Sequence, residues 1–264
     1  MTKEIFDLAG RSAFVTGAAS GLGFAMTEAM VESGAAVCLA DVDANNLDKA
    51  VDHFRRQSNQ VEGVELDVRD PAKIKQVVKA YADRQGRLDV MFANAGITGG
   101  APISQPDGAI ETIDLDVWRN VLDVNLTGVF ATLQAAAAVM KPQRSGRIIA
   151  TASIAGMRTS NVSGYAYSST KAAVIQIVKL AAAELAQYDI RVNGIAPGPF
   201  LTNIAGGRMF TDPARRDFMA QGTALKRVAD PKELKGLVTL LASDAASFIT
   251  GQVIAIDGGA LVIT

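Results

Sequence analysis

Two residues with complementary acid–base chemistry, Tyr167 and Lys171, lie four positions apart in the chain. We expect residues 165–187 to form a helix, so that the two side chains share one face. A free phenol, with a pKa of about 10, exchanges protons poorly near neutrality, and a neighbouring cation lowers that pKa by stabilising the phenolate. The pair therefore predicts general acid/base catalysis. The same spacing also occurs by chance on exposed helices, so the prediction needs support from the rest of the chain.

A glycine-rich turn supplies part of that support. Gly17, Gly21 and Gly23 lie between an apolar run at 12–16 and a helical pattern at 21–33. Glycine permits a tight turn and lets backbone N–H groups approach an anion at the start of a helix. Asp41 lies 18 residues beyond Gly23, where a carboxylate normally accepts hydrogen bonds from the adenosine ribose. An alternative role for Asp41 is to cap the next helix, but the turn and the acid together predict dinucleotide binding.

Short aliphatic runs alternate with helical patterns along the chain, which is typical of βαβ units. We expect strands at 12–16, 36–40, 61–66, 88–92, 146–151, 190–195 and 253–256, and helices at 21–33, 44–57, 71–85, 114–140, 165–187 and 231–243. The pattern predicts an α/β fold of the Rossmann type, with a doubly wound parallel sheet of seven strands and helices on both faces. The long stretch at 198–225 lacks a regular pattern, and we expect a substrate lid there.

Composition and charge exclude several classes of protein. The 264 residues carry 26 Lys and Arg against 27 Asp and Glu, a formal net charge of −1 that argues against a nucleic-acid partner. Hydrophobic residues make up 49% of the chain and no linker divides it, so we expect one catalytic domain over 1–264. The scattered acids and the lone His53 show no metal-ligand spacing, so we expect no metal.

Targeting signals are equally sparse. No uninterrupted apolar run is long enough to span a bilayer, and residues 1–10 lack the apolar core of a signal peptide. We therefore expect no membrane partner. The single Cys38 cannot form an internal disulfide and favours a reducing compartment, so we expect a cytoplasmic protein.

Further motifs follow one another in an order typical of one enzyme family. They are TGAASGLG at 16–23, Asp41, Asp67-Val68, Asn94-Ala95-Gly96, Asn125, Ser153, Tyr167 with Lys171, Pro197-Gly198, Thr202, and Thr250-Gly251-Gln252 to Asp257-Gly258-Gly259. With these motifs the chain resembles the short-chain dehydrogenase/reductase family in its compact, NAD-dependent form, over essentially its whole length. The resemblance implies an oxidoreductase that interconverts a small-molecule secondary alcohol and a ketone with NAD. It also implies a homo-oligomer, and the form expected from the family is a tetramer.

The resemblance assigns roles to single residues. Tyr167 is implied to exchange a proton with the substrate oxygen, which Ser153 positions. Lys171 is implied to hold the nicotinamide ribose and to lower the phenol pKa, and Asn125 to connect Lys171 to solvent through a water. Asp67 and Val68 are implied to contact adenine, Asn94 to lie beside the cofactor ribose, and Thr202 near the nicotinamide amide. The full implied cofactor-binding set is Gly17, Ser20, Gly21, Leu22, Gly23, Asp41, Asp67, Val68, Asn94, Gly96, Tyr167, Lys171, Pro197, Gly198 and Thr202.

Two details leave the choice of hydroxyl groups open. Ser153 and Tyr167 are separated by 13 residues, one more than is common in the family, and a shifted loop would bring Thr151 into the role of Ser153. Tyr165 is a second tyrosine in the same segment. It is followed four positions later by Ser169 and not by a lysine, which favours Tyr167 as the acid/base.

Three other functions stay open. The same residues could serve an NADPH-dependent 3-oxoacyl-type ketoreductase, although Asp41 and the absence of Arg or Lys at Ser20 and Val42 argue against NADP. A non-catalytic nucleotide-binding protein of the same fold would be expected to have lost one of the four catalytic residues, and none is lost here. A methyltransferase would share the turn and the acid but would have no use for Tyr167 with Lys171.

Overall fold

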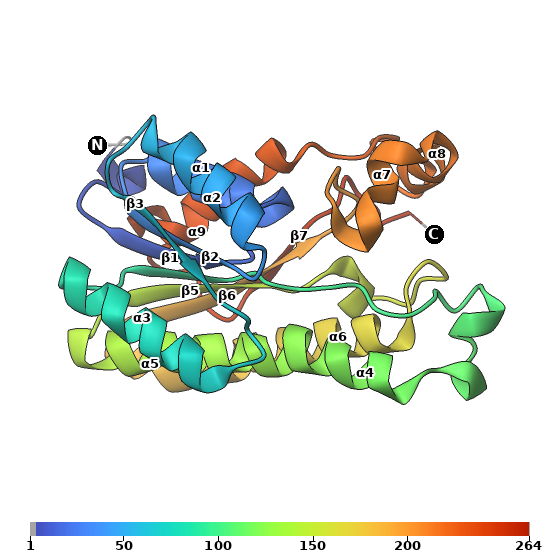
Figure 1. Cartoon of the computed structure of the whole chain (residues 1–264), viewed down its shortest axis with the longest axis horizontal. Coiled ribbons are helices and arrows are strands. Elements are labelled where there is room, and N and C mark those ends of the chain that lie inside the picture. The colour runs from blue at the N-terminus through green and yellow to red at the C-terminus, as the bar shows by residue number, and fades with distance from the viewer. Residues whose placement is uncertain (1–3, 264) are drawn as a thin grey trace.

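The computed structural model describes residues 4–263, apart from the side chains of Ala205 and Arg208. Parallel strands form a seven-stranded sheet in the order β3-β2-β1-β4-β5-β6-β7 (Figure 1). The strands are β1 (Ser12–Thr16), β2 (Ala36–Asp41), β3 (Val61–Glu65), β4 (Val90–Ala93), β5 (Gly146–Thr151), β6 (Ile190–Pro197) and β7 (Val253–Ile256). This confirms the predicted fold class. The strand order reverses between β1 and β4, and sheets of this kind bind ligands at the carboxyl ends of the strands at that point.

Helices cover both faces of the sheet (Figure 1). One face carries α1 (Gly21–Glu32), α2 (Ala44–Arg55) and α9 (Lys235–Ala242). The other carries α3 (Pro71–Gln85), α4 (Leu115–Leu122), α5 (Val129–Gln143) and α6 (Tyr165–Leu185). Two short helices, α7 (Arg208–Thr211) and α8 (Pro213–Gln221), lie together at one end of the molecule, inside the stretch predicted to be a lid.

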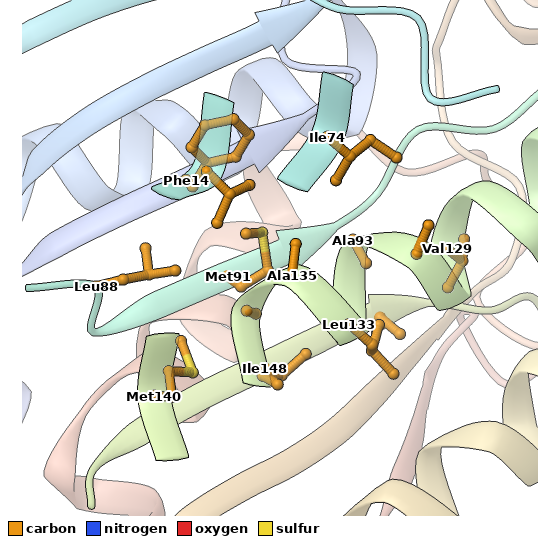
Figure 2. Packing of buried hydrophobic residues seen from close by; sticks show 14 of the residues in the cluster. Phe14, Ile74, Leu88, Met91, Ala93, Val129, Leu133, Ala135, Met140 and Ile148 are labelled. Carbon is orange, nitrogen blue, oxygen red and sulfur yellow. The ribbon is translucent and has the colours of Figure 1, made fainter. Parts of the chain in front are cut away.

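The apolar core forms one layer on each side of the sheet. Side chains alternate along a strand, so Phe14 of β1 belongs to the layer under α3 and α5 while Val15 belongs to the layer under α1. Figure 2 shows the first layer, in which Phe14, Met91 and Ile148 of three strands belong to one cluster with Ile74 of α3 and Leu133 of α5. Because both faces are covered, every residue of β1 and β5 is buried. This burial explains why these strands read as continuous apolar runs.

Local capping chemistry sets several helix ends. The side chains of Asp43 and Asp70 accept hydrogen bonds from backbone N–H groups in the first turns of α2 and α3. Pro71 occupies the first turn of α3, and Gly86, with φ 73°, ends that helix in the left-handed region. These residue types are readable in the sequence, and the observed ends of α3 coincide with the predicted ones.

The long helix predicted at 114–140 is not regular. It consists of α4, a π-helical turn at Asp123–Gly128, and α5, which runs on to Gln143. A period of 3.6 residues cannot reveal one wider turn, so the prediction of a uniform helix is wrong there. Within the described residues, Leu115–Gln143 is the one helix long and apolar enough to cross a membrane, and 50% of its most apolar window is buried inside the protein. That burial, against the core of a globular fold, marks it as a core helix.

Several other boundaries differ from the prediction by one or two residues, and two differences have a clear local cause. β4 begins at Val90 and not at Leu88, because the N–H and C=O of Leu88 pair with the side chain of Gln143. The helix predicted at 231–243 starts with a 3₁₀ turn at Pro231–Leu234 before α9 begins. Neither difference moves a candidate site residue out of place.

Candidate active site

The four residues predicted to be catalytic meet at the carboxyl end of the sheet. Ser153 comes shortly after β5, and Tyr167 and Lys171 lie in the first two turns of α6. The Ser153 side chain hydrogen-bonds the Tyr167 phenol, and Lys171 Nζ lies 5.7 Å from the centroid of the Tyr167 ring. A Cβ built on Gly96 would lie 3.3 Å from Asn125 Oδ1 and 3.4 Å from Lys171 Nζ. A glycine at 96 therefore lets Asn125 and Lys171 approach the same point.

Lys171 is a buried cation held by one main-chain group. Its residue is 3% exposed, and Nζ donates a hydrogen bond of 2.7 Å to the carbonyl oxygen of Thr151. Burial lowers the pKa of Lys171 to about 8. An ammonium has three N–H donors, so two remain for other partners. A cation with spare donors next to a phenol suits both ribose binding and stabilisation of a phenolate.

Tyr167 differs from the expectation drawn from its spacing to the lysine. Burial raises the pKa of the Tyr167 phenol above its ordinary value, and the hydrogen bond with Ser153 lowers it only in part. The expected net lowering of the Tyr167 pKa by Lys171 is therefore wrong for this structure. The physical reason is that desolvation of the phenolate outweighs the hydrogen bond with Ser153. At neutral pH Tyr167 is therefore a neutral phenol that can donate a proton.

Asn125 lies in the π-helical turn between α4 and α5, and its side chain is buried. Its Nδ2 donates to the carbonyl of Ile97 and its Oδ1 accepts from the N–H of Ile97, both at 2.8 Å. The amide thus ties the turn to the segment after β4. The wider turn brings Asn125 to this place, and such turns are frequent at functional sites.

The glycine turn has the geometry of an anion cradle. Gly17 and Gly21 have φ values of 64° and 55°, and a Cβ on Gly17 would lie 2.9 Å from Cα of Ala95. A Cβ on Gly23 would lie 2.0 Å from the carbonyl oxygen of Gly17, so no other residue fits at position 23. Ser20 is the N-cap residue of α1 and its exposed side chain makes no capping hydrogen bond. The first N–H groups of α1 and the Ser20 hydroxyl are thus available to a diphosphate.

Asp41 lies beside this turn at the end of β2. One carboxylate oxygen accepts from the N–H of Ala19 at 2.9 Å, and the other accepts from the N–H of Asp43 at 3.1 Å. Each oxygen keeps a free lone pair, which is what two ribose hydroxyls require. The helix cap of α2 is Asp43, so the alternative role considered for Asp41 is wrong.

Asp67 and Val68 follow β3 on the same side of the molecule. Val68 is buried, and Asp67 forms an ion pair with Arg69, whose Nη2 lies 2.6 Å from Oδ2. The hydrogen bonds from Arg69 lower the pKa of Asp67. Sequence reasoning did not anticipate this pair, although Arg69 two positions later was the available signal.

The segment after β6 returns to the glycine turn. β6 ends at Pro197 with Gly198 following, and Thr202 is buried, its Cβ and methyl group 3.3 Å from a Cβ built on Gly21. A cavity of about 290 Å³ opens between α1, this segment and α7, and is lined by residues that include Gly21, Phe24, Thr202 and Phe210. The structure therefore brings two of the predicted binding residues, Gly21 and Thr202, together although they are far apart in the sequence.

Asn94 is the residue whose environment was least expected. Its side chain donates to the carbonyls of Thr16 and Gly17 at 3.0 and 3.2 Å, and accepts from the Thr151 hydroxyl at 3.0 Å. All of these partners are protein groups, so the side chain holds the turn together.

Among the described residues no group of His, Cys, Asp and Glu has the arrangement of a metal site.

Comparisons with known proteins cover nearly the whole chain. Residues 17–260 match the family model described as enoyl-(acyl carrier protein) reductase. The chain is 36% identical to the 3-oxoacyl-[acyl-carrier-protein] reductase FabG of Thermotoga maritima, over 97% of this chain and 99% of that protein. It is also 36% identical to the cis-4-hydroxycyclohexanecarboxylate dehydrogenase of Sinomonas cyclohexanicum, over 94% of this chain and 96% of that protein. The crystal structure of a short-chain type dehydrogenase/reductase from Mycobacterium marinum aligns with a TM-score of 0.90 at 33% identity, covering 98% of this chain and 99% of that one.

Proposed function

The chain belongs to the short-chain dehydrogenase/reductase family, and on that premise we propose that it interconverts a secondary alcohol and a ketone, with NAD as the hydride carrier and Tyr167 as the general acid/base. The observation that carries this proposal is the arrangement of three side chains in one place. Ser153 hydrogen-bonds the Tyr167 phenol, and the buried ammonium of Lys171 lies over the same ring. A nucleotide-binding protein without catalysis has no need of a buried cation next to a phenol.

Each of these residues has a distinct role in the proposed reaction. The nicotinamide cofactor, when bound, supplies or accepts the hydride. In reduction, the Tyr167 hydroxyl donates its proton to the ketone oxygen, which the Ser153 hydroxyl orients. In oxidation, the Tyr167 phenolate accepts the alcohol proton, and Lys171 stabilises that phenolate by its positive charge. Burial lowers the pKa of Lys171 to about 8, so the side chain is still mainly an ammonium at neutral pH.

The preference for NAD over NADP is argued from Asp41. The carboxylate is held at the edge of the glycine turn by the N–H groups of Ala19 and Asp43. A 2′-phosphate bound there would place two like charges in contact, whereas two ribose hydroxyls would find acceptors. Neither Ser20 nor the 60% exposed Val42 supplies a cation for a phosphate. These features support NAD.

Turnover with both cofactors tests the proposal. We would assay the purified protein with NAD and with NADP against a panel of secondary alcohols, following the absorbance of the reduced nicotinamide. 4-Hydroxycyclohexanecarboxylate belongs in the panel because a 36% identical relative is named for it. Cyclohexanol is included because it is the same ring alcohol without the carboxylate. NAD-linked oxidation that Tyr167→Phe abolishes supports the proposal. Failure of every alcohol and every corresponding ketone with both cofactors refutes it.

A second candidate is suggested by the similarity to FabG. A 3-oxoacyl-type ketoreductase would use the same Ser153, Tyr167 and Lys171 but would take its hydride from NADPH. An acetoacetyl thioester assayed with NADPH and with NADH separates the two proposals. Faster reduction with NADPH favours the 3-oxoacyl candidate and counts against the role given to Asp41.

We also propose that residues 198–225 act as the substrate lid of a single catalytic domain. Phe210 of α7 and Phe218 of α8 are 53% and 64% exposed, so the segment carries apolar surface that a bound substrate could cover.

We propose as well that the protein is a homo-oligomer. Leu115, Phe130 and Leu180 on α4, α5 and α6 are exposed, and a second copy of the chain could cover this apolar surface.

A further inference from the structure

A chain of hydrogen bonds joins the glycine turn to the buried lysine. Asn94 Nδ2 donates to the carbonyl oxygens of Thr16 and Gly17, at 3.0 and 3.2 Å. Asn94 Oδ1 accepts from Thr151 Oγ1 at 3.0 Å, and the carbonyl oxygen of Thr151 accepts from Lys171 Nζ at 2.7 Å. Thr151 therefore contacts Asn94, which holds the glycine turn, with its side chain, and it contacts the ammonium of Lys171 with its main chain.

The Thr151 hydroxyl decides how the Asn94 amide is oriented. The amide has one acceptor oxygen and two N–H donors, and the two carbonyls of Thr16 and Gly17 require the two donors. With Thr151 donating to Oδ1, every polar atom of this side chain has a partner. Without that donor, Asn94 Oδ1 loses its hydrogen bond. That bond favours the present orientation of the amide over the one in which Oδ1 and Nδ2 exchange places. The hydroxyl thus keeps the turn in the shape that presents its N–H groups.

The same residue also aims the lysine. Lys171 is 3% exposed, and the Thr151 carbonyl is the acceptor to which its Nζ donates. Tyr167 is the titratable side chain whose ring lies next to Nζ, 5.7 Å from the centroid, and the uncharged Asn125 faces Nζ across Gly96. Because one N–H of the ammonium points at the Thr151 carbonyl, the directions of its other two N–H groups are fixed as well. A displacement of the end of β5 therefore redirects the ammonium.

We propose that Thr151 is a positioning residue that couples the glycine turn, which holds the cofactor diphosphate, to Lys171, which holds the cofactor ribose. The inference rests on the proposed function, because that function assigns the two ends to one bound dinucleotide. It differs from the role first considered for Thr151, because the hydroxyl donates to Asn94. Thr151 acts through its two neighbours and touches no reacting atom.

The test compares three variants by their affinity for NAD, measured by isothermal titration without substrate. Thr151→Val keeps the branched shape and loses the hydroxyl, and Thr151→Ser keeps the hydroxyl. Thr132→Val is the matched control, since Thr132 is buried and its hydroxyl donates to the carbonyl of Gly128, four residues earlier in the chain. Thr151→Val is expected to raise the dissociation constant for NAD about tenfold, as for loss of one buried hydrogen bond. Thr151→Ser and Thr132→Val are expected to bind as the parent does.

Coupling to the lysine is measured in a second background. If Thr151 acts partly through Lys171, Thr151→Val raises the dissociation constant for NAD less in a Lys171→Met protein than in the parent. The expected increase is about threefold in place of about tenfold. A merely structural role would lower the melting temperature and leave this difference at zero. Equal costs in both backgrounds, or parent-like binding by Thr151→Val, overturn the proposal. Thr151→Ala replaces the valine variant if that variant does not fold.

These outcomes are separable from a failure of the proposed function. A parent protein that binds NAD but turns over no alcohol refutes the proposed reaction and leaves the role of Thr151 testable by the same titrations. A parent protein that binds neither NAD nor NADP overturns both proposals, because no dinucleotide then connects the glycine turn and Lys171.

Discussion

Replacing Lys171 with methionine is expected to stabilise the fold although it damages the site. Burial lowers the pKa of Lys171 from its ordinary 10.5 to about 8. At neutral pH the folded protein therefore carries an ammonium at a cost of about 3 kcal/mol, at 1.4 kcal/mol for each pKa unit. Loss of the hydrogen bond to the Thr151 carbonyl offsets about 1 kcal/mol of the gain. The net expectation is a stabilisation of about 2 kcal/mol, or a melting temperature raised by roughly 4–8 °C.

The pH dependence of this effect has a definite sign. The unfolded chain keeps the lysine proton up to about pH 10.5, whereas the folded protein releases it near pH 8. Between these pH values the unfolded state binds more protons, so the stability of the parent protein rises with pH. Lys171→Met lacks this titration. Its advantage over the parent is therefore full below pH 8 and shrinks as the pH rises toward 10.5. Above that pH the variant is less stable than the parent by about 1 kcal/mol, because only the lost hydrogen bond to the Thr151 carbonyl then counts.

Thermal and urea unfolding of the ligand-free proteins at pH 7, 9 and 10.5 would measure the difference. Lys179→Met is the control, because Lys179 lies on the same helix with its side chain exposed. Turnover of Lys171→Met should fall at the same time, and NAD should bind more weakly. A variant less stable than its parent at pH 7, or an advantage that does not change with pH, would show that Lys171 is not a strained cation and that the argument from burial is mistaken.

Four further predictions follow from the site. Tyr167→Phe should lower turnover about 10²-fold or more with little change in NAD affinity, whereas Tyr165→Phe should be mild, and steady-state kinetics with direct NAD titration would detect a reversal. Ser153→Ala should reduce kcat more than it weakens NAD binding, and equal losses in both would contradict its placement on the substrate oxygen. The parent should prefer NAD over NADP by about 30- to 100-fold in kcat/KM, and Asp41→Ala should narrow that ratio, whereas a parent without preference would show that Asp41 does not face the ribose. Hydrogen exchange in 198–225 should slow when cofactor and alcohol bind, and equal protection in both states would exclude a lid.

The parts of the fold that could be predicted are those determined by residues close together in the sequence. The turn of Gly17, Gly21 and Gly23 between a buried strand and a helix has a local cause, and so have the caps at Asp43 and Asp70. The meeting of distant motifs at the carboxyl edge of a parallel sheet follows from the fold class. The π-helical turn at 123–128 could not be predicted, because its hydrogen bonding depends on what α4 and α5 pack against.

The charge states of the site were beyond sequence reasoning for a related reason. The spacing of Tyr167 and Lys171 correctly predicts that they are neighbours, but the direction of a pKa shift depends on how much water each group has lost. Desolvation raises the pKa of Tyr167 and lowers that of Lys171, so burial makes both charged forms costly. Depth of burial is a property of the whole fold, and no motif reports it.

The two hydroxyl groups at the end of β5 show where spacing ceases to assign a role. Thr151 and Ser153 are two positions apart, so strand alternation would place both on one face and make them equivalent candidates. β5 ends at Thr151, which still lies beside the segment after β4 and there meets Asn94. Ser153 lies past the strand end, where it caps a short 3₁₀ turn and meets Tyr167. The end of the strand therefore separates a hydroxyl that donates to Asn94 from one that lies next to the Tyr167 phenol.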